Sequence, residues 1–244
     1  MKRSDKTVLW LSATLAVIAV AAVAFSLLVL DRRPRPSATA SDSSLLVLTW
    51  APSLCKVEPS TNGCRNGHVG KLGQAFVLHG LWPQPSTEQY CAVPKGQRSR
   101  APVDLPDDLK STLQSMMSDS SFMTTHEWYA HGTCSGVKPP EYFRIATALA
   151  QQAGPVLDPL FAGPPGRRVT SRQVRDAFDT RFGNGAGARV GLVCKDADGQ
   201  GRLAYEVRLS LPPVVRLGQN PPSLATALAQ GPTIPPGCGQ APLP

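Results

Sequence analysis

Two of the chain's four histidines, His126 and His131, flank Glu127 in the segment HEWYAHGTC. A zinc-binding helix carries H-E-x-x-H, because histidines four residues apart lie about 40° apart around a helix and can share one ion. Here the histidines are five residues apart, so on a helix their rings would diverge by about 140°. We therefore expect no metal at this segment. The same helix would place Glu127 and His131 on one face, where a carboxylate and an imidazole can touch.

A third histidine, His79, lies in the segment FVLHGLWPQ. Two imidazoles can divide acid and base work near neutral pH, because the unperturbed pKa of histidine is close to that range. Such a pair suits transfer at phosphorus, in which the base takes a proton from the attacking oxygen and the acid gives one to the leaving oxygen. A third, cationic donor then stabilises charge on the phosphoryl oxygens. The three histidines predict an acid–base enzyme without a cofactor, with phosphate esters as a candidate substrate. His68, in the polar segment NGHVGK, is expected to be structural.

The elements that must position these histidines are a mixture of strands and helices. The segment 45–55 begins as an apolar strand and ends in a proline-marked turn. A second apolar run, 74–84, also indicates a strand and carries His79 where the run is broken by glycine and proline. Four segments combine helical spacing of apolar residues with helix start or stop signals, and they span 105–121, 121–132, 139–154 and 170–183. Two late strands, 188–194 and 202–211, are separated by the turn-rich KDADGQG, and the proline-rich tail is expected to be irregular. This order of elements favours the α+β class.

The length and charge of the chain fit one ordinary domain and an accessory segment. The chain has 244 residues and a formal net charge of +8. Residues 1–40 hold six of the 25 basic and two of the 17 acidic residues, which leaves a net charge of +4 on residues 41–244. A mildly basic domain is compatible with a polyanionic substrate but does not identify one. We expect a single domain over 41–244.

The N-terminal segment predicts export. Residues 1–6 are basic and residues 7–30 form an uninterrupted apolar run of 24, long enough to span a bilayer. Residues 38–40, Ala-Thr-Ala, resemble a signal-cleavage site. Two interpretations stay open: a cleaved export signal, or an uncleaved membrane anchor with the domain outside. Both predict a periplasmic or secreted domain, which favours disulfides among the six cysteines.

The segments FVLHGLWPQ and HEWYAHGTC resemble the two active-site segments of the RNase T2 family, in the same order and at a similar separation. The resemblance extends weakly through RQVRDAF, VGLVCK and LAYEVRLSL, and so covers roughly residues 45–211. It implies an α+β fold in which several helices pack on a central antiparallel sheet stapled by disulfides. It also implies a monomer.

The resemblance implies a metal-independent endoribonuclease that cleaves single-stranded RNA with low base specificity. The 2′-hydroxyl of RNA would attack the adjacent phosphorus and give a 2′,3′-cyclic phosphate, which is later hydrolysed to a 3′-phosphate. DNA would not be cleaved, because it lacks that nucleophile. By resemblance His131 is the general base, His79 the general acid and His126 a donor to the phosphate. Glu127 would support His131 and the transition state.

The resemblance also implies that Trp82 and Gln84, which follow His79 in the sequence, bind RNA. Trp82 resembles the family's base-stacking residue, and an aromatic face can bind any base. Gln84 stands where some relatives carry an aspartate that reads adenine, so a preference for one base cannot be transferred. The glutamine could still hydrogen-bond a base edge.

Besides Gln84, a second position departs from the family pattern. The residue before His131 is usually lysine, and here it is Ala130. A cation that would stabilise the transition state is therefore missing, unless Lys138 or an arginine replaces it. This departure supports the main alternative, a catalytically weakened RNA-binding relative. A zinc hydrolase is a second alternative.

The cysteines fit the disulfides that the resemblance implies. Cys91 would pair with Cys134 and Cys194 with Cys238, which leaves Cys55 and Cys64 as a local pair. Six cysteines allow fifteen pairings, and their spacing alone does not choose among them. The competing interpretation makes Cys134 a nucleophile.

Overall fold

The computed structural model describes residues 41–94, 101–218 and 222–244. The predicted export segment, residues 1–40, and its apolar run lie outside these residues, as does the choice between signal and anchor. Within the described residues, none of the helices combines the length and the apolar character that crossing a bilayer requires.

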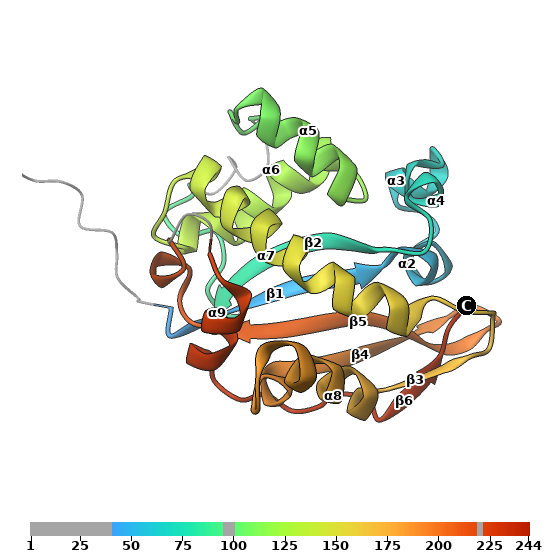
Figure 1. The fold of residues 1–244 in the computed structure, drawn as a ribbon. Helices are drawn as coiled ribbons and strands as arrows, with labels where there is room; N and C mark the ends of the chain where they lie inside the picture. The colour runs from blue at the N-terminus through green and yellow to red at the C-terminus, as the bar shows by residue number, and fades with distance from the viewer. Residues whose placement is uncertain (1–40, 95–100, 219–221) are drawn as a thin grey trace, which may run out of the picture. The chain divides into compact units, whose positions relative to one another are not determined.

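A four-stranded antiparallel sheet forms the centre of the described chain, in the order β2-β1-β5-β4 (Figure 1). The strands are β1 (Ser43–Trp50), β2 (Phe76–Gln84), β4 (Val190–Ala197) and β5 (Gly201–Leu211). The predicted strands at 74–84, 188–194 and 202–211 are confirmed. As predicted, the strand in 45–55 stops before the proline: β1 ends at Trp50. The proline-marked turn is the start of a short helix, α2 (Ala51–Val57), with Pro52 in its first turn.

The four predicted helices are present. They are α5 (Asp107–Met116), α6 (Ser120–Ala130), α7 (Pro139–Phe161) and α8 (Ser171–Phe182). The last begins with a capping box between Thr170 and Gln173. Helix α7 does not stop at Gly154 as expected but continues through two prolines. Its last turns place Leu157 and Phe161 in the hydrophobic core, and this burial outweighs the local helix-breaking signals.

Short elements complete the fold, and several were not predicted. Two small helices, α3 (Asn62–Arg65) and α4 (His68–Leu72), precede β2, and 3₁₀ turns occur at Gly132–Cys134, Gly187–Arg189 and Val214–Arg216. The tail is not irregular as expected: it contains α9 (Leu224–Gln230) and β6 (Gln240–Pro242). Ser223 caps α9, and β6 pairs antiparallel with β3 (Arg168–Thr170). The proline-rich sequence did not predict these elements. Burial of Leu224, Leu228 and Ala241 in the tertiary structure stabilises them, and the local composition does not show this burial.

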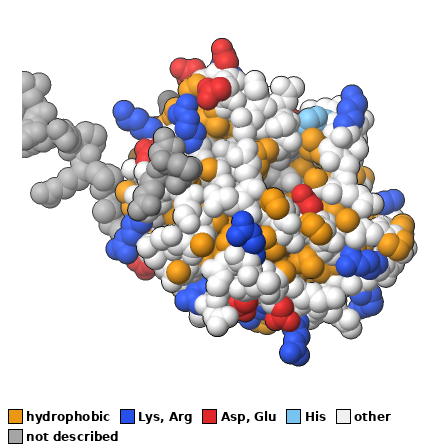
Figure 2. Space-filling view, viewed as in Figure 1, with side chains coloured by type: hydrophobic (Ala, Val, Ile, Leu, Met, Phe, Trp, Pro, Cys, Tyr) orange, Lys and Arg blue, Asp and Glu red, His pale blue; other side chains and the backbone are white. Residues whose placement is uncertain are grey.

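Helix α7 covers one face of the sheet over β1 and β2, while α5 and α6 lie beside β2 (Figure 1). Strand β2 is an edge strand, and α7 supplies part of its hydrogen bonding. The buried hydroxyl of Tyr142 donates to the carbonyl of Leu81 and accepts from the amide of the same residue. Basic side chains are scattered over the face seen in Figure 2, as expected for a mildly basic domain. The fold thus holds β2 and α6, the two elements that carry the histidines, against one another.

Candidate active site

His79 occupies a β-bulge. The pairing of β1 with β2 passes from Leu48–Leu78 to Val47–Gly80, which leaves His79 as the extra residue. A bulge redirects a side chain and is common beside active sites. The Nδ1 atom of His79 lies 3.4 Å from Oγ1 of Thr49 on the neighbouring strand, and 27 % of the side chain is exposed.

Glycine is required at residue 80. A Cβ atom there would overlap Oε2 of Glu127 and would lie 2.8 Å from Nε1 of Trp82. The absence of a side chain lets the carboxylate on α6 approach the backbone of β2. Glu127 is fully buried, and its Oε2 accepts a hydrogen bond of 2.9 Å from Nε1 of Trp82.

Glu127 faces His79 and His126. Its Oε1 lies 3.8 Å from Nε2 of His79 and 3.9 Å from Nε2 of His126. Among the described residues, this oxygen has no hydrogen-bond partner, although it is buried. The carboxylate thus sits among the histidines: its two shortest ion-pair distances lead to His79 and His126, and a ligand atom of His131 lies within 4.8 Å of it. The support of His131 by Glu127 stays a prediction.

His131 does not belong to the helix that carries Glu127. Helix α6 ends at Ala130, and His131 caps it with φ −123° and ψ −48°. Its ring is stacked on Trp82, with centroids 5.2 Å apart and planes at 29°, and lies 6.2 Å from the ring of His126. The expected 140° divergence of His126 and His131 fails for the same reason, since both residues would have to lie on one regular helix. One ligand atom from each of His126, Glu127 and His131 lies within 4.8 Å of the others, so helix geometry no longer argues against a shared ion.

Burial sets the protonation of the cluster. Removal from water disfavours the charged form, and it lowers the pKa of His79 and of His131 to about 4 in each case. The pKa of His126 is also lowered by burial. Burial raises the pKa of Glu127 to about 8, against the opposing effect of the Trp82 hydrogen bond. At mildly acidic pH the site therefore holds neutral His79 and His131 rings beside a protonated Glu127 carboxyl group.

A cavity of about 610 Å³ opens beside His79 and His126. Glu58, Asp119 and the exposed ring of Phe122 also line it. The Phe122 ring stacks on His126, with centroids 5.8 Å apart and planes at 8°. Sequence reasoning missed Phe122, although its position four residues before His126 on a helix is a signal that could have found it.

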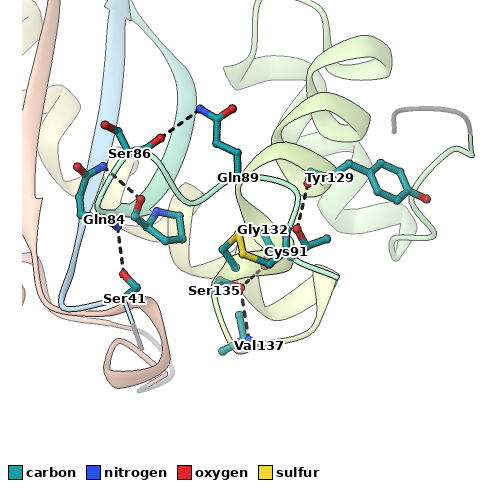
Figure 3. Close-up of a disulfide and its surroundings, with 12 residues drawn as sticks. Ser41, Gln84, Ser86, Gln89, Cys91, Tyr129, Gly132, Ser135 and Val137 are labelled. Carbon is teal, nitrogen blue, oxygen red and sulfur yellow. Dashed lines mark hydrogen bonds between the residues drawn. A yellow bond between two sulfur atoms is a disulfide. The ribbon is translucent and has the colours of Figure 1, made fainter. Parts of the chain in front are cut away.

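The two predicted RNA-binding residues lie outside that cavity. The Trp82 indole contacts Glu127, His79 and His131. It also contacts Arg208, whose Cζ lies 5.4 Å from the indole centroid. The side-chain amide of Gln84 donates to the carbonyls of Trp82 and Pro83, and its backbone amide donates to Ser41 (Figure 3).

Among the described residues, Lys195 and Arg208 are cations whose charge acts on His79. Ala130 itself is buried, with 2 % of its surface exposed. Lys138 is exposed at the start of α7, and no contact joins it to the histidines within the described residues. Arg208, on β5, is the arginine that reaches the cluster, through Trp82.

All three implied disulfides are present: Cys55–Cys64, Cys91–Cys134 and Cys194–Cys238. Since Cys134 is bonded, the alternative that it acts as a nucleophile is wrong. The Cys91–Cys134 bond joins the loop after β2 to the turn after α6 (Figure 3). The amide of Tyr90 donates to the carbonyl of Ala130 beside it, so two links hold the loop next to His131. His68 lies apart, at the start of α4, with Nε2 3.1 Å from the carbonyl of Met117.

Known proteins resemble this chain in sequence and in fold. The family model of the Ribonuclease T2 family matches residues 41–219. Ribonuclease MC from Momordica charantia is 28 % identical over 179 residues, which cover 69 % of this chain and 86 % of that protein. A ribonuclease from Aeromonas hydrophila is 30 % identical over 111 residues, 46 % of each chain.

Solved structures agree with the sequence matches. A crystal structure of an RNase MC1 mutant with 5′-GMP superposes with a TM-score of 0.54 at 25 % identity and covers 70 % of this chain and 88 % of the other. RNase NT in complex with 5′-AMP gives a TM-score of 0.56 at 20 % identity, over 83 % of this chain and 96 % of the other. The resemblance and the fold predicted from two short segments are confirmed, and the chain belongs to the ribonuclease T2 family of enzymes.

Proposed function

We propose that the protein is a metal-independent endoribonuclease that cleaves single-stranded RNA through a 2′,3′-cyclic phosphate. One observation carries the proposal. His79 from β2 and His131 from the end of α6 both lie against the indole of Trp82, with centroid distances of 5.1 and 5.2 Å. Two imidazoles at one small site can flank a single phosphodiester.

In the proposed reaction each proton has a defined route. Neutral His131 accepts the proton of the 2′-hydroxyl while the 2′-oxygen forms a bond to phosphorus. The bond from phosphorus to the 5′-oxygen breaks, and protonated His79 gives its proton to that oxygen. A hydroxyl end and a cyclic phosphate result. Water then replaces the leaving alcohol, the two histidines exchange roles, and the ring opens to a 3′-phosphate.

Glu127 and His126 would stabilise the charge that develops on the phosphoryl oxygens. With its pKa raised to about 8, Glu127 carries a proton under acidic and neutral conditions. The Trp82 N–H occupies Oε2, so the proton is placed on Oε1, which faces His79 and His126. A neutral acid at this position donates a hydrogen bond to a phosphoryl oxygen without repelling its charge.

The cavity beside His79 and His126 is a suitable place for one base of the RNA. Phe122 is 60 % exposed at its wall, and aromatic faces bind bases through stacking. The base-stacking role of Trp82 and the base-reading role of Gln84 stay predictions. In the ligand-free protein the indole is stacked on His131, and the Gln84 amide is directed to its own strand.

We also propose that the domain works outside the cytoplasm as a secreted or periplasmic monomer. Three disulfides support export, because such bonds persist in oxidising compartments. The mass of the exported protein distinguishes a cleaved signal from a retained anchor. A mass equal to that of a chain beginning near residue 41 shows cleavage. The mass of the full-length chain in the membrane fraction shows anchoring.

Product analysis on a short RNA tests the proposed reaction. We expect cyclic phosphate ends early and 3′-phosphate ends later, in the presence of excess EDTA. An otherwise identical oligonucleotide with a single 2′-deoxy nucleotide is the control, and the bond after that nucleotide should stay intact. Cleavage at the deoxy position, or products with 5′-phosphate ends, would exclude the mechanism.

Ala130 supports one alternative, a weakened enzyme that acts mainly by binding RNA. Replacement of Ala130 by lysine tests it, with Ala130→Met as a control that adds a similar stem without charge. A large gain in kcat for the lysine variant alone would show that the native protein is impaired. Because Ala130 is buried, thermal unfolding of both variants must accompany the rates.

A further inference from the structure

Arg208 and Trp82 form a contact that the proposed chemistry does not use. The guanidinium carbon of Arg208 lies 5.4 Å from the indole centroid, in cation–π range. The same indole is stacked on His131, stands edge-on to His79 and donates to Glu127. Any movement of this ring therefore disturbs three groups of the site at once.

Glu206 holds the guanidinium from the same strand. It lies two residues before Arg208 on β5, so both side chains project from the same face of the sheet. Its Oε1 lies 3.5 Å from Nε of Arg208, and only 2 % of the Glu206 side chain is exposed. These two atoms are buried, and within the described part of the chain neither has a hydrogen-bond partner. The two side chains are therefore held together by the attraction of their opposite charges rather than by a hydrogen bond between these atoms.

An ion pair whose carboxylate is buried while its guanidinium side chain is 35 % exposed is poor evidence for stability. Desolvation of two charges can cost as much as their attraction returns, and an apolar pair of similar volume is often as stable. The register of the sheet places the pair beside the site: Arg208 is opposite Val47, and Val47 is opposite Gly80. Gly80 is the residue that lets Glu127 approach.

We propose that Arg208 and Glu206 are positioning residues that act on the site through Trp82. Glu206 fixes the guanidinium, the guanidinium fixes the indole plane, and the indole N–H fixes the buried carboxyl group of Glu127 between His79 and His126. This inference rests on the proposed function for its kinetic consequence, but the positioning itself can be observed without turnover.

The test compares Arg208→Gln, Arg208→Lys and Glu206→Gln with the wild-type chain. The matched control is Arg172→Gln, which removes an arginine paired with a carboxylate on the exposed side of α8, away from the site. Each variant is measured for kcat and KM on a short RNA and for hydrogen exchange of the Trp82 indole N–H by NMR, assigned with Trp82→Phe.

We expect Arg208→Gln to lower kcat by about tenfold to a hundredfold with little change in KM, because a misplacement of catalytic groups by about 1 Å has effects of that size. The indole N–H should exchange faster in the same variant. Glu206→Gln should change both readouts in the same direction and less strongly, and Arg208→Lys should restore part of both. Arg172→Gln should match the wild type.

Two outcomes would overturn the inference. Suppose that Arg208→Gln raises KM without changing kcat and also reduces the slope of log K for RNA binding against log salt concentration by about one. The arginine then contacts a substrate phosphate instead. If the indole exchange is unchanged, Arg208 does not hold Trp82. Wild-type protein that fails to cleave RNA would refute the proposed function, whereas the exchange experiment would still decide the positioning.

Discussion

The indole N–H of Trp82 donates a 2.9 Å hydrogen bond to the buried carboxyl group of Glu127. The two residues come from β2 and α6, separated by 45 positions in the chain. Their contact is possible only because Gly80 has no side chain. It fixes one carboxyl oxygen and leaves the other directed at two histidines. The consequences of this arrangement for activity and stability can be measured.

Loss of either proposed acid–base residue should abolish most turnover. We expect His79→Ala and His131→Ala each to lower kcat by about 10²–10⁴-fold, the contribution that positioned proton transfer makes. His68→Ala is the control, because that ring lies at the start of α4 with a backbone carbonyl as its partner. Initial rates on a short RNA measure the effect. Near-wild-type activity of either site variant would refute its assigned role.

The pH dependence of the reaction should have an acidic optimum. His79 must be protonated to act as the acid, and its pKa in the free protein is lowered to about 4. At pH 7 only about one molecule in a thousand would carry that proton, so kcat/KM should fall as pH rises above about 4. The value of about 4 for the pKa of His131 places the acidic limb nearby. A profile of kcat/KM that peaks above pH 7 would contradict this assignment.

Glu127 should reduce stability at neutral and alkaline pH. The pKa of Glu127 is about 8 in the folded protein, against an ordinary value of 4.5. Because the folded protein binds this proton more tightly than the unfolded chain does, the contribution of Glu127 to the free energy of unfolding is fully present below pH 4.5. That contribution is lost as the pH rises through 8. Glu127→Gln keeps an acceptor for Trp82 and removes the charge. We expect it to unfold like the wild type near pH 4 and to be more stable by about 4 kcal/mol at pH 8.

Urea unfolding at the two pH values measures this difference. A wild-type protein that gains stability relative to Glu127→Gln between pH 4 and pH 8 would show that the carboxyl group is ionised at little cost. The variant should keep part of its activity, because its side-chain N–H can donate to a phosphoryl oxygen where the carboxyl proton does, although less strongly.

Chelation separates histidine chemistry from metal chemistry. His126, Glu127 and His131 are close enough together to be tested as ligands. We expect activity to be unchanged after dialysis against EDTA and after addition of zinc at a stoichiometric amount. Metal analysis of the purified domain completes the measurement. Activity that is lost with EDTA and returns with zinc would establish a zinc hydrolase instead.

The Cys91–Cys134 disulfide should support both stability and the position of His131. The loop that it closes and the loop closed by Cys194–Cys238 have nearly equal lengths, 43 and 44 residues. Removal of either bond by a pair of Cys→Ala changes should therefore cost a similar free energy of unfolding, about 3–4 kcal/mol. Only the first change should lower kcat in the fraction that stays folded, because that bond ends three residues after His131. Equal loss of kcat in the two variants would show that the effect is global.

The sequence alone determined the chemical groups and the local elements that carry them. The segments around His79 and His126 identified the family, because residue types and short spacings survive without knowledge of the fold. The helices at 105–121 and 170–183 were predictable from apolar periodicity and end signals, which are local properties. The α+β class followed from their order.

The tertiary structure decided how these groups meet. His79 is aimed by a bulge that depends on the register of two strands, and His131 leaves α6 one residue past its end. Neither event is encoded in a helical or strand period, so the approach of His79 and His126 to the Glu127 carboxylate could not be predicted from the sequence. The buried contact of Trp82 with Glu127 and the approach of Arg208 from β5 depend on pairing between distant segments. Long-range packing fixes such geometry, and a local pattern of residues contains no measure of it.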